Sequence, residues 1–158
     1  IVDVEASGFG AHSYPIEIGV ALADGQRFCK LIRPFSCWKY WDASAQQVHG
    51  ISYQDLLENG EDPVAVCLAL NEFANGLTLY SDAWVVDHPW MVKLFAQSAV
   101  PMAFSISAIE MVLSEPQMDA EKQAVANASG LARHRASADA YIIQQTFMRT
   151  QLRMGHSQ

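Results

Sequence analysis

Hydrophobic and polar positions alternate along the first part of the chain, a pattern typical of strands. It predicts strands over residues 1–5, 15–23 and 27–32. Asp24 and Gly25 separate the second strand from the third, and an Asp-Gly pair favours a tight hairpin turn. Pro34 ends the third strand because proline cannot donate to a strand ladder. We therefore expect a first strand followed by an antiparallel hairpin.

The apolar positions of the remaining chain recur mostly at helical spacing. Over 63–75 the apolar residues fall on one face, Pro63 suits a first helical turn and Gly76 suits a helix end. The pattern predicts helices over 44–48, 53–59, 63–75, 87–97, 107–113 and 137–154, strands over 77–81 and 103–106, and a polar, Ala-rich helix with loops over 114–129. Three strands followed by alternating helices and strands favour an α/β fold with a mixed sheet.

Composition narrows the class of protein. The chain has 158 residues, which suits one domain over 1–158. Hydrophobic residues make up 51% and charged residues 17%, which excludes intrinsic disorder. No apolar run approaches the roughly 18 residues of a membrane helix, so we expect no membrane partner. The chain begins Ile-Val-Asp without Met, so we expect further residues before Ile1.

Net charge and cysteine content limit which partners and which cellular compartment are expected for the protein. The net charge is −7, whereas a protein that coats duplex nucleic acid is usually basic. Any nucleic-acid contact should therefore be short and local, with scattered cations such as Arg33, Lys39, Lys93, Arg133 and Arg135 meeting one or two phosphates. The three cysteines lack a CxxC spacing, which favours reduced thiols and a cytoplasmic protein.

Two acids stand on the first predicted strand. Asp3 and Glu5 are two residues apart, so their side chains project from the same face. Neighbouring carboxylates repel one another, and burial increases the cost. A hard divalent cation such as Mg²⁺ is usually held by carboxylate oxygens and would compensate that charge. Two solvated acids at an exposed strand end are the simpler alternative when this pair is considered alone.

Three further residues are candidates for chemistry. Asp87 precedes an amphipathic helical stripe, and Asp139 stands in the first turn of the last predicted helix. Each could be an ordinary acid that stabilises a helix N-terminus. His134 lies just before that last helix and could be an ordinary loop residue. Asp82 competes with Asp87 for the same role, but we expect it to face solvent or to cap a turn.

Taken in order, these residues resemble the DEDDh 3′–5′ exonucleases, the family of proofreading exonuclease subunits, RNase T and oligoribonuclease. Residues 3–9 (DVEASGF) are similar to the family's first motif. Residues 16–21 (IEIGVA) resemble its second strand, and 48–52 (VHGIS) resemble its HGI(T/S) segment. Residues 81–87 resemble the second motif, and His134 with Asp139 matches the His-x4-Asp third motif. The resemblance covers nearly the whole chain.

The resemblance implies an RNase H-like fold, with a mixed five-stranded sheet flanked by helices. It implies two Mg²⁺ or Mn²⁺ ions, held by Asp3, Glu5, Asp87 and Asp139, with His134 as general base. The substrate implied is the 3′ end of single-stranded or short nucleic acid, DNA or RNA, and the product is a nucleoside 5′-monophosphate. Substrate contacts are expected from Ala6, Ser7, Gly8, Phe9 and His49. Several relatives dimerise, which leaves a homodimer open.

The sequence also departs from the family pattern, and other functions remain open. Ala6 replaces a usual Thr, and Val86 stands where Phe is frequent. The alternatives are a catalytically weak nucleic-acid-binding module on the same fold, an RNase H-like endonuclease, and an interaction domain with surface acids. The loop aromatics Trp38, Tyr40 and Trp41 either pack over a sheet edge or form one wall of a substrate groove.

Overall fold

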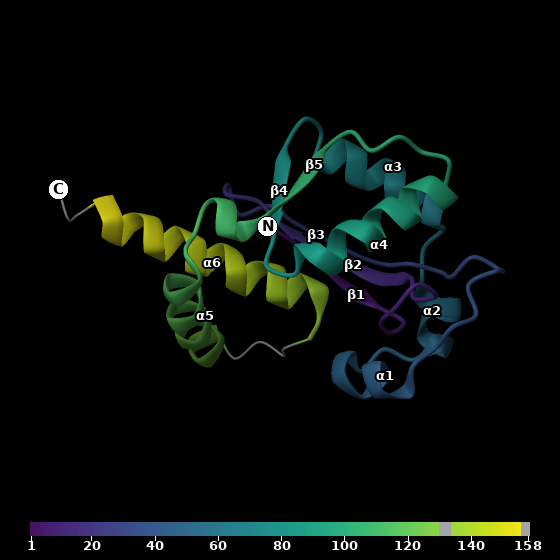
Figure 1. The fold of residues 1–158 in the computed structure, drawn as a ribbon. Coiled ribbons are helices and arrows are strands. Elements are labelled where there is room, and N and C mark those ends of the chain that lie inside the picture. The colour runs from purple at the N-terminus through teal and green to yellow at the C-terminus, as the bar shows by residue number, and fades with distance from the viewer. Residues whose placement is uncertain (130–133, 156–158) are drawn as a thin grey trace.

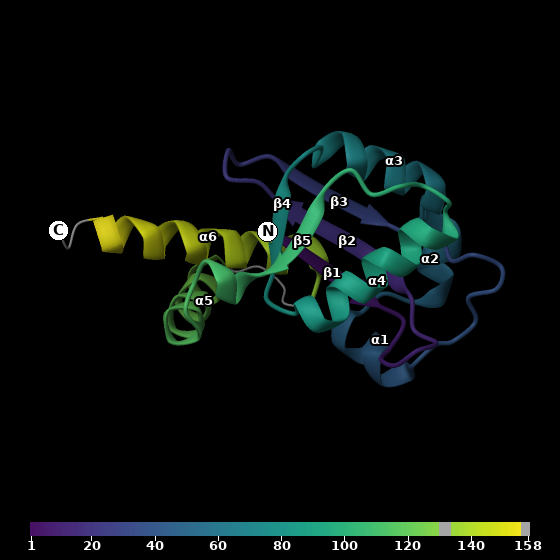
Figure 2. The ribbon, with the colours of Figure 1, turned by 45° about the horizontal axis from the view of Figure 1, so that its top comes forward.

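Alternating strands and helices build the chain, and a computed structural model describes residues 1–129 and 134–155. The elements in chain order are β1 (Val2–Ala6), β2 (Pro15–Ala21), β3 (Arg27–Leu31), α1 (Ala43–His49), α2 (Tyr53–Asn59), α3 (Pro63–Phe73), β4 (Thr78–Ser81), α4 (Trp84–Gln97), β5 (Ser105–Ala108), the 3₁₀ helix η1 (Ile109–Met111), α5 (Glu115–Ser129) and α6 (Ala136–Gly155). In both views α1 and α2 lie at one end of the molecule and α5 and α6 at the other (Figures 1 and 2). The α/β fold class is confirmed.

The first three strands form an antiparallel sheet in the order β1-β2-β3. Every residue of the central strand β2 is buried. In the register of β1 on β2, Asp3 lies opposite Gly19 and Glu5 lies opposite Glu17. Cross-strand partners share a face of the sheet, so three acids and one glycine gather on that face.

The prediction of one five-stranded sheet is wrong, because the five described strands pair as a three-stranded and a two-stranded sheet. Among the described residues β4 pairs with β5 in a parallel ladder, and this pair forms a separate two-stranded sheet. β1 and β4 lie in contact, but no backbone hydrogen bond joins them in the described part of the chain. Strands form one sheet only where their backbone groups reach each other in register, and the four-residue strand β4 does so with β5 alone.

Two apolar cores cover the two faces of the three-stranded sheet. On one face Val4 and Ile18 pack with residues of α3 and α4, such as Leu70 and Leu94. On the other face Ala21 packs with residues that include Ile143 of α6. The sheet therefore lies between α3 and α4 on one side and α6 on the other, with α5 packed along α6 (Figure 1). Within the described residues, no helix combines the length and the hydrophobicity that crossing a bilayer requires.

Most element boundaries agree with the sequence pattern within two residues, with two exceptions. The helix predicted over 107–113 is wrong, because β5 extends to Ala108 and only the short 3₁₀ helix η1 follows it. The second exception is α4. The helix begins at Trp84, three residues before the predicted start. Its N-cap residue, Ala83, makes no side-chain capping bond, so the sequence carries no start signal there. Instead the backbone N–H of Ala83 donates to Ser81 Oγ at 3.0 Å. In contrast, α1, α2 and α3 begin after capping residues whose side chains accept backbone N–H bonds: Asp42, Ser52 and Asp62.

Gly19 allows α6 to approach β2. A Cβ at Gly19 would lie 2.1 Å from the carbonyl carbon of Ala136, which is backbone and cannot rotate away. Gly25 in the hairpin turn has a φ of +88° but nothing within 4 Å of an added Cβ. The two glycines are therefore required for different reasons, close packing at Gly19 and a left-handed backbone at Gly25.

We predict that Gly19→Ala costs more stability than Gly25→Ala. Gly19→Ala forces β2 and α6 apart, which should cost about 3 kcal/mol, the upper end of ordinary overpacking. Gly25→Ala should cost only the left-handed backbone penalty of about 1–2 kcal/mol. Urea unfolding of the two variants measures both values. An equal loss in both would contradict the close approach of α6 to Gly19.

Candidate functional site

A cavity of about 310 Å³ opens beside the edge strand β1. It receives residues from the first loop, from α1, from the start of α4, from α5 and from the beginning of α6. Its lining residues are Asp3, Val4, Glu5, Ala6, Gly8, Phe9, Ala45, Val48, His49, Asp82, Ala83, Val86, Asp87, Trp90, Lys122, His134 and Asp139. The cavity thus brings together segments from both ends of the described chain.

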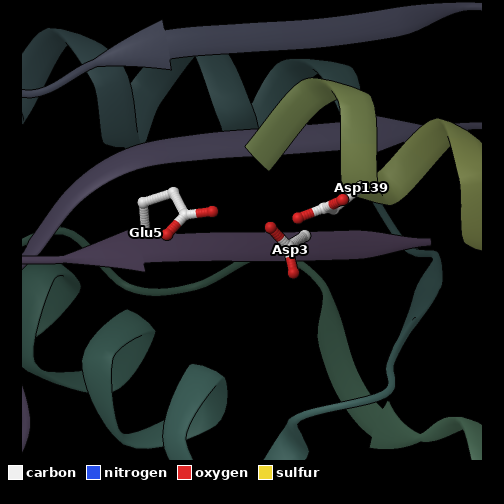
Figure 3. Close-up of side chains that lie close together, drawn as sticks. All are labelled: Asp3, Glu5 and Asp139. Carbon is white, nitrogen blue, oxygen red and sulfur yellow. The ribbon is translucent and has the colours of Figure 1, made fainter. Parts of the chain in front are cut away.

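Three carboxylates converge in this cavity. One oxygen each from Asp3, Glu5 and Asp139 lies within 4.8 Å of the other two. Asp3 and Glu5 project from β1, and Asp139 comes from the first turn of α6 (Figure 3). Carboxylate oxygens at this spacing are a donor set suited to a hard divalent cation.

Asp87 reaches the same cavity from the opposite side of the sheet, but it is not part of that close group. Its side chain is 1% exposed and lies in the first turn of α4. Ser81 Oγ donates a hydrogen bond of 2.7 Å to Asp87 Oδ2, and Ser81 Oγ itself accepts the Ala83 N–H. Ser81 therefore orients the Asp87 carboxylate toward the cavity.

Burial and mutual repulsion make these acids harder to ionise. Burial, followed by repulsion from Asp87, Glu5 and Asp139, raises the pKa of Asp3 well above its usual range. Burial, followed by Asp139 and Glu17, raises the pKa of Glu5 to about 8. Burial raises the pKa of Asp87 to about 7, against the opposing hydrogen bond from Ser81. A bound cation would relieve the repulsion that raises these pKa values.

His134 lies at the rim of the cavity, immediately before α6. The residue is exposed, and its φ of +61° is unusual for a residue other than glycine. Its backbone N–H donates to Asp139 Oδ2 at 2.9 Å. This hydrogen bond joins the candidate general base to one of the three clustered acids.

Most of the residues expected to meet substrate line the cavity. Ala6 and Gly8 form part of its wall, and a Cβ on Gly8 would lie 2.7 Å from Tyr40 Cε1. Phe9 is 71% exposed at the rim, with its ring 5.9 Å from that of Trp90. Ser7 is different: it is fully buried outside the cavity lining, and its Oγ accepts the Tyr14 N–H at 3.2 Å. Ser7 therefore shapes the loop and does not face the cavity.

His49 forms part of the cavity wall and is buried. Its ring Nδ1 accepts the Ile51 N–H at 3.0 Å, so the neutral ring carries its proton on Nε2. Nε2 is buried and has no hydrogen-bond partner among the described residues. Burial lowers the pKa of His49, which keeps the ring neutral. Trp41 packs edge-on against His49, while Trp38 is buried against Tyr14.

The position of Asp82 and the partner of Arg135 differ from what the sequence predicts. Asp82 does not face solvent: it lines the cavity and forms an ion pair with Lys122 of α5. The segment joining β4 to α4 turns the Asp82 side chain inward, a direction that sequence spacing does not reveal. Arg135 binds Glu17 through its guanidinium group, and Arg133 lies outside the described residues.

Two buried polar residues at this site were not anticipated as functional from the sequence. Ser81 hydrogen-bonds the Asp87 carboxylate, but a serine at a strand end is too common to attract notice. Glu17 is 1% exposed on β2. A weak signal was present for Glu17, because every other residue over 15–23 is apolar or glycine. An acid in such a run is either exposed or paired within the fold.

No family model and no curated protein match this sequence. Its fold is similar to that of E. coli Exonuclease I in complex with a dA16 oligonucleotide, with a TM-score of 0.71 and 14% identity over 97% of this chain and 41% of that chain. It is also similar to the zinc-bound form of the E. coli ExoI–ssDNA complex, with a TM-score of 0.71 and 14% identity over 99% of this chain and 40% of that chain. At this identity the likeness shows a shared fold. The chain spans about two fifths of the length of these structures.

The raised pKa values predict how the metal-free protein responds to pH. Between about pH 4.5 and pH 8 the folded state binds protons on Glu5 and Asp87 that the unfolded state has released. The free energy of unfolding should therefore fall as pH rises through this range, by at most about 1.4 kcal/mol per pH unit for each group. Urea unfolding at several pH values in EDTA measures the slope.

Glu5→Gln should flatten this slope, because the variant has no carboxyl at that position to release a proton. The control is Glu61→Gln, which changes an exposed glutamate outside the cavity and should keep the wild-type slope. A rise in stability from pH 5 to pH 8 in the metal-free wild type would contradict the burial of these acids.

Proposed function

We propose that this chain is a metal-dependent 3′–5′ exonuclease that releases nucleoside 5′-monophosphates from single-stranded or short nucleic acid. One observation carries the proposal. The carboxylates of Asp3, Glu5 and Asp139 converge within 4.8 Å in a cavity that Asp87 and His134 also line. The resemblance to the DEDDh motifs and the fold shared with Exonuclease I support the same function.

The donor set fits Mg²⁺ or Mn²⁺. Asp3, Glu5 and Asp139 would hold one cation, and Asp87 together with Asp3 would hold a second. Lys122 is the one Lys or Arg that lines the cavity in the described part of the chain, and it is paired with Asp82. The remaining acids therefore need an external cation to balance their charge. Two bound divalent ions supply an activated water and stabilise the leaving 3′-oxygen.

His134 is suited to receive the proton of the attacking water. The residue is exposed at the rim of the cavity, and its backbone N–H is bound to Asp139, one of the clustered acids. A neutral imidazole nitrogen can accept a proton near neutral pH, which is the requirement for a general base. The backbone bond from His134 to Asp139 keeps this base and a metal-ligand carboxylate in a fixed relation.

The cavity suits the end of a strand. Its volume of about 310 Å³ lies near the lower end of the range for ligand pockets, roughly 300–1,000 Å³. It can hold one terminal nucleotide, with Phe9 stacking on the base and His49 forming part of the wall. Base stacking on an aromatic ring tolerates any base. A site of this size favours terminal removal over cleavage inside a strand.

The direct test digests matched RNA and DNA oligonucleotides that carry a 5′ label, with Mg²⁺ or Mn²⁺. An exonuclease should shorten the labelled strand one nucleotide at a time and release mononucleotides. Internal fragments at early times would instead indicate an endonuclease. Binding without turnover in either metal would indicate a catalytically weak binding module.

Asp3→Asn should reduce turnover below detection, because a neutral amide is a poor ligand for a hard cation. The metal-free variant should be at least as stable as wild type, since one repelling charge is gone. The control is Asp119→Asn, an exposed acid of α5 outside the cavity, which should retain wild-type turnover. Thermal unfolding in EDTA reports the stability. A marked loss of metal-free stability in Asp3→Asn would assign Asp3 a structural role.

His134→Ala should lower turnover by about 10²–10⁴-fold, the usual contribution of a general base. Metal affinity should change little, because the side chain is not among the clustered oxygen donors. Isothermal titration with Mn²⁺ and the pH dependence of kcat measure the two effects separately. A collapse of Mn²⁺ affinity would instead make His134 a ligand.

A further inference from the structure

Glu17 is a buried acid whose bonds all lead to the start of α6 or to a neighbouring strand. Its carboxylate accepts Arg135 Nη2 at 2.6 Å and Arg135 Nε at 3.1 Å. Its Oε2 also accepts the Ala136 N–H at 2.9 Å, and the Cys29 thiol lies 3.8 Å from Oε1. One carboxylate on the central strand thus binds two consecutive residues that lie almost 120 positions later in the chain.

The geometry of β2 makes this attachment possible. Glu17 and Gly19 are two residues apart, so they share the face of the sheet that meets α6. The missing side chain at Gly19 lets the Ala136 backbone come close, as its 2.1 Å distance from an added Cβ shows. The backbone of Ala136 therefore lies within reach of the Glu17 carboxylate.

His134 is the residue immediately before this anchored pair. Its φ of +61° places it in the left-handed region, which is unfavourable for a residue with a side chain. Such a conformation persists only where the surroundings hold it. Here Arg135 and Ala136 are fixed by Glu17 on one side, and the His134 N–H is bound to Asp139 on the other.

We propose that Glu17 is a positioning residue for His134, acting through Arg135 and Ala136. Glu17 does not line the cavity, so it does not touch the substrate. The inference rests on the proposed function, because it assigns Glu17 the task of holding the general base at the rim. Loss of the Glu17 carboxylate should leave the clustered oxygens of Asp3, Glu5 and Asp139 in place while releasing the segment that carries His134.

The test begins with Glu17→Gln and its matched control Glu61→Gln, which also removes a paired carboxylate but from an exposed bridge to Lys30. Glu17→Gln should lower kcat on a short oligonucleotide by about 10–100-fold, the usual effect of a lost supporting contact, with KM within about threefold. Amide hydrogen exchange over residues 134–136 should become faster. Glu61→Gln should change neither quantity.

A double-mutant cycle with His134→Ala separates positioning from general stability. If Glu17 acts through His134, adding Glu17→Gln to His134→Ala should lower kcat by less than about threefold. An equal loss in both backgrounds, or unchanged amide exchange over 134–136, would overturn the proposal. A kcat loss for Arg135→Lys that is smaller than the loss for Glu17→Gln would support the proposal, because lysine keeps the charge but cannot make the bidentate contact.

Two further outcomes, a variant that does not fold and a wild type without nuclease activity, can be told apart from a failed positioning role. Should Glu17→Gln fail to fold, Arg135→Lys carries the same cycle, because the Arg135 side chain is 45% exposed and its replacement leaves the core intact. Failure of the proposed function leaves the wild type without nuclease activity. Failure of the positioning role instead leaves an active wild type with additive variants.

Discussion

The repulsion among buried carboxylates is the constraint on which the site depends. Asp3, Glu5 and Asp139 lie within 4.8 Å of one another, and burial raises the pKa of Asp3 and of Glu5. Such a cluster is unfavourable in a protein that gains nothing from it. The packing of the sheet against α6 and α4 supplies the free energy that keeps these acids together, and a divalent cation would turn the repulsion into binding energy.

The β1–β2 register gives the two faces of the sheet different roles. Val4 opposite Ile18 belongs to the face that packs on α3 and α4, and this face is apolar. Glu5 opposite Glu17 belongs to the face that meets α6, and this face carries the charges. Because strand side chains alternate, one strand can stabilise the fold and present acids at the same time. Asp87 comes from α4, on the apolar side of the sheet. It can still line the cavity with Asp3 and Glu5 because β1 is an edge strand.

Ion pairs and hydrogen bonds then determine how accurately the acids and the histidine are placed. Ser81 orients Asp87, and Glu17 binds the backbone and side chain that follow His134. The carboxylates of Asp87 and Glu17 are buried, where an unpaired carboxylate would be costly, so their partners hold the geometry firmly. Lys122 with Asp82 adds a link between α5 and the start of α4 across the cavity. The candidate chemistry thus rests on polar contacts between segments far apart in the chain.

The α/β class and nearly all helices and strands follow from the sequence alone, as does the gathering of Asp3, Glu5, Asp87, His134 and Asp139 at one cavity. Apolar periodicity and turn chemistry are local properties, so β2, β3 and α3 follow from short stretches of residues, and the order of the acids with His134 shows the resemblance. The sequence did not determine the pairing of β4 with β5 alone, the start of α4 at Trp84, the inward direction of Asp82 or the burial of Ser7. Nor did it determine the bonds of Glu17 to Arg135 and Ala136. These features depend on contacts between residues distant in sequence, whose geometry exists only once the sheet and helices have packed.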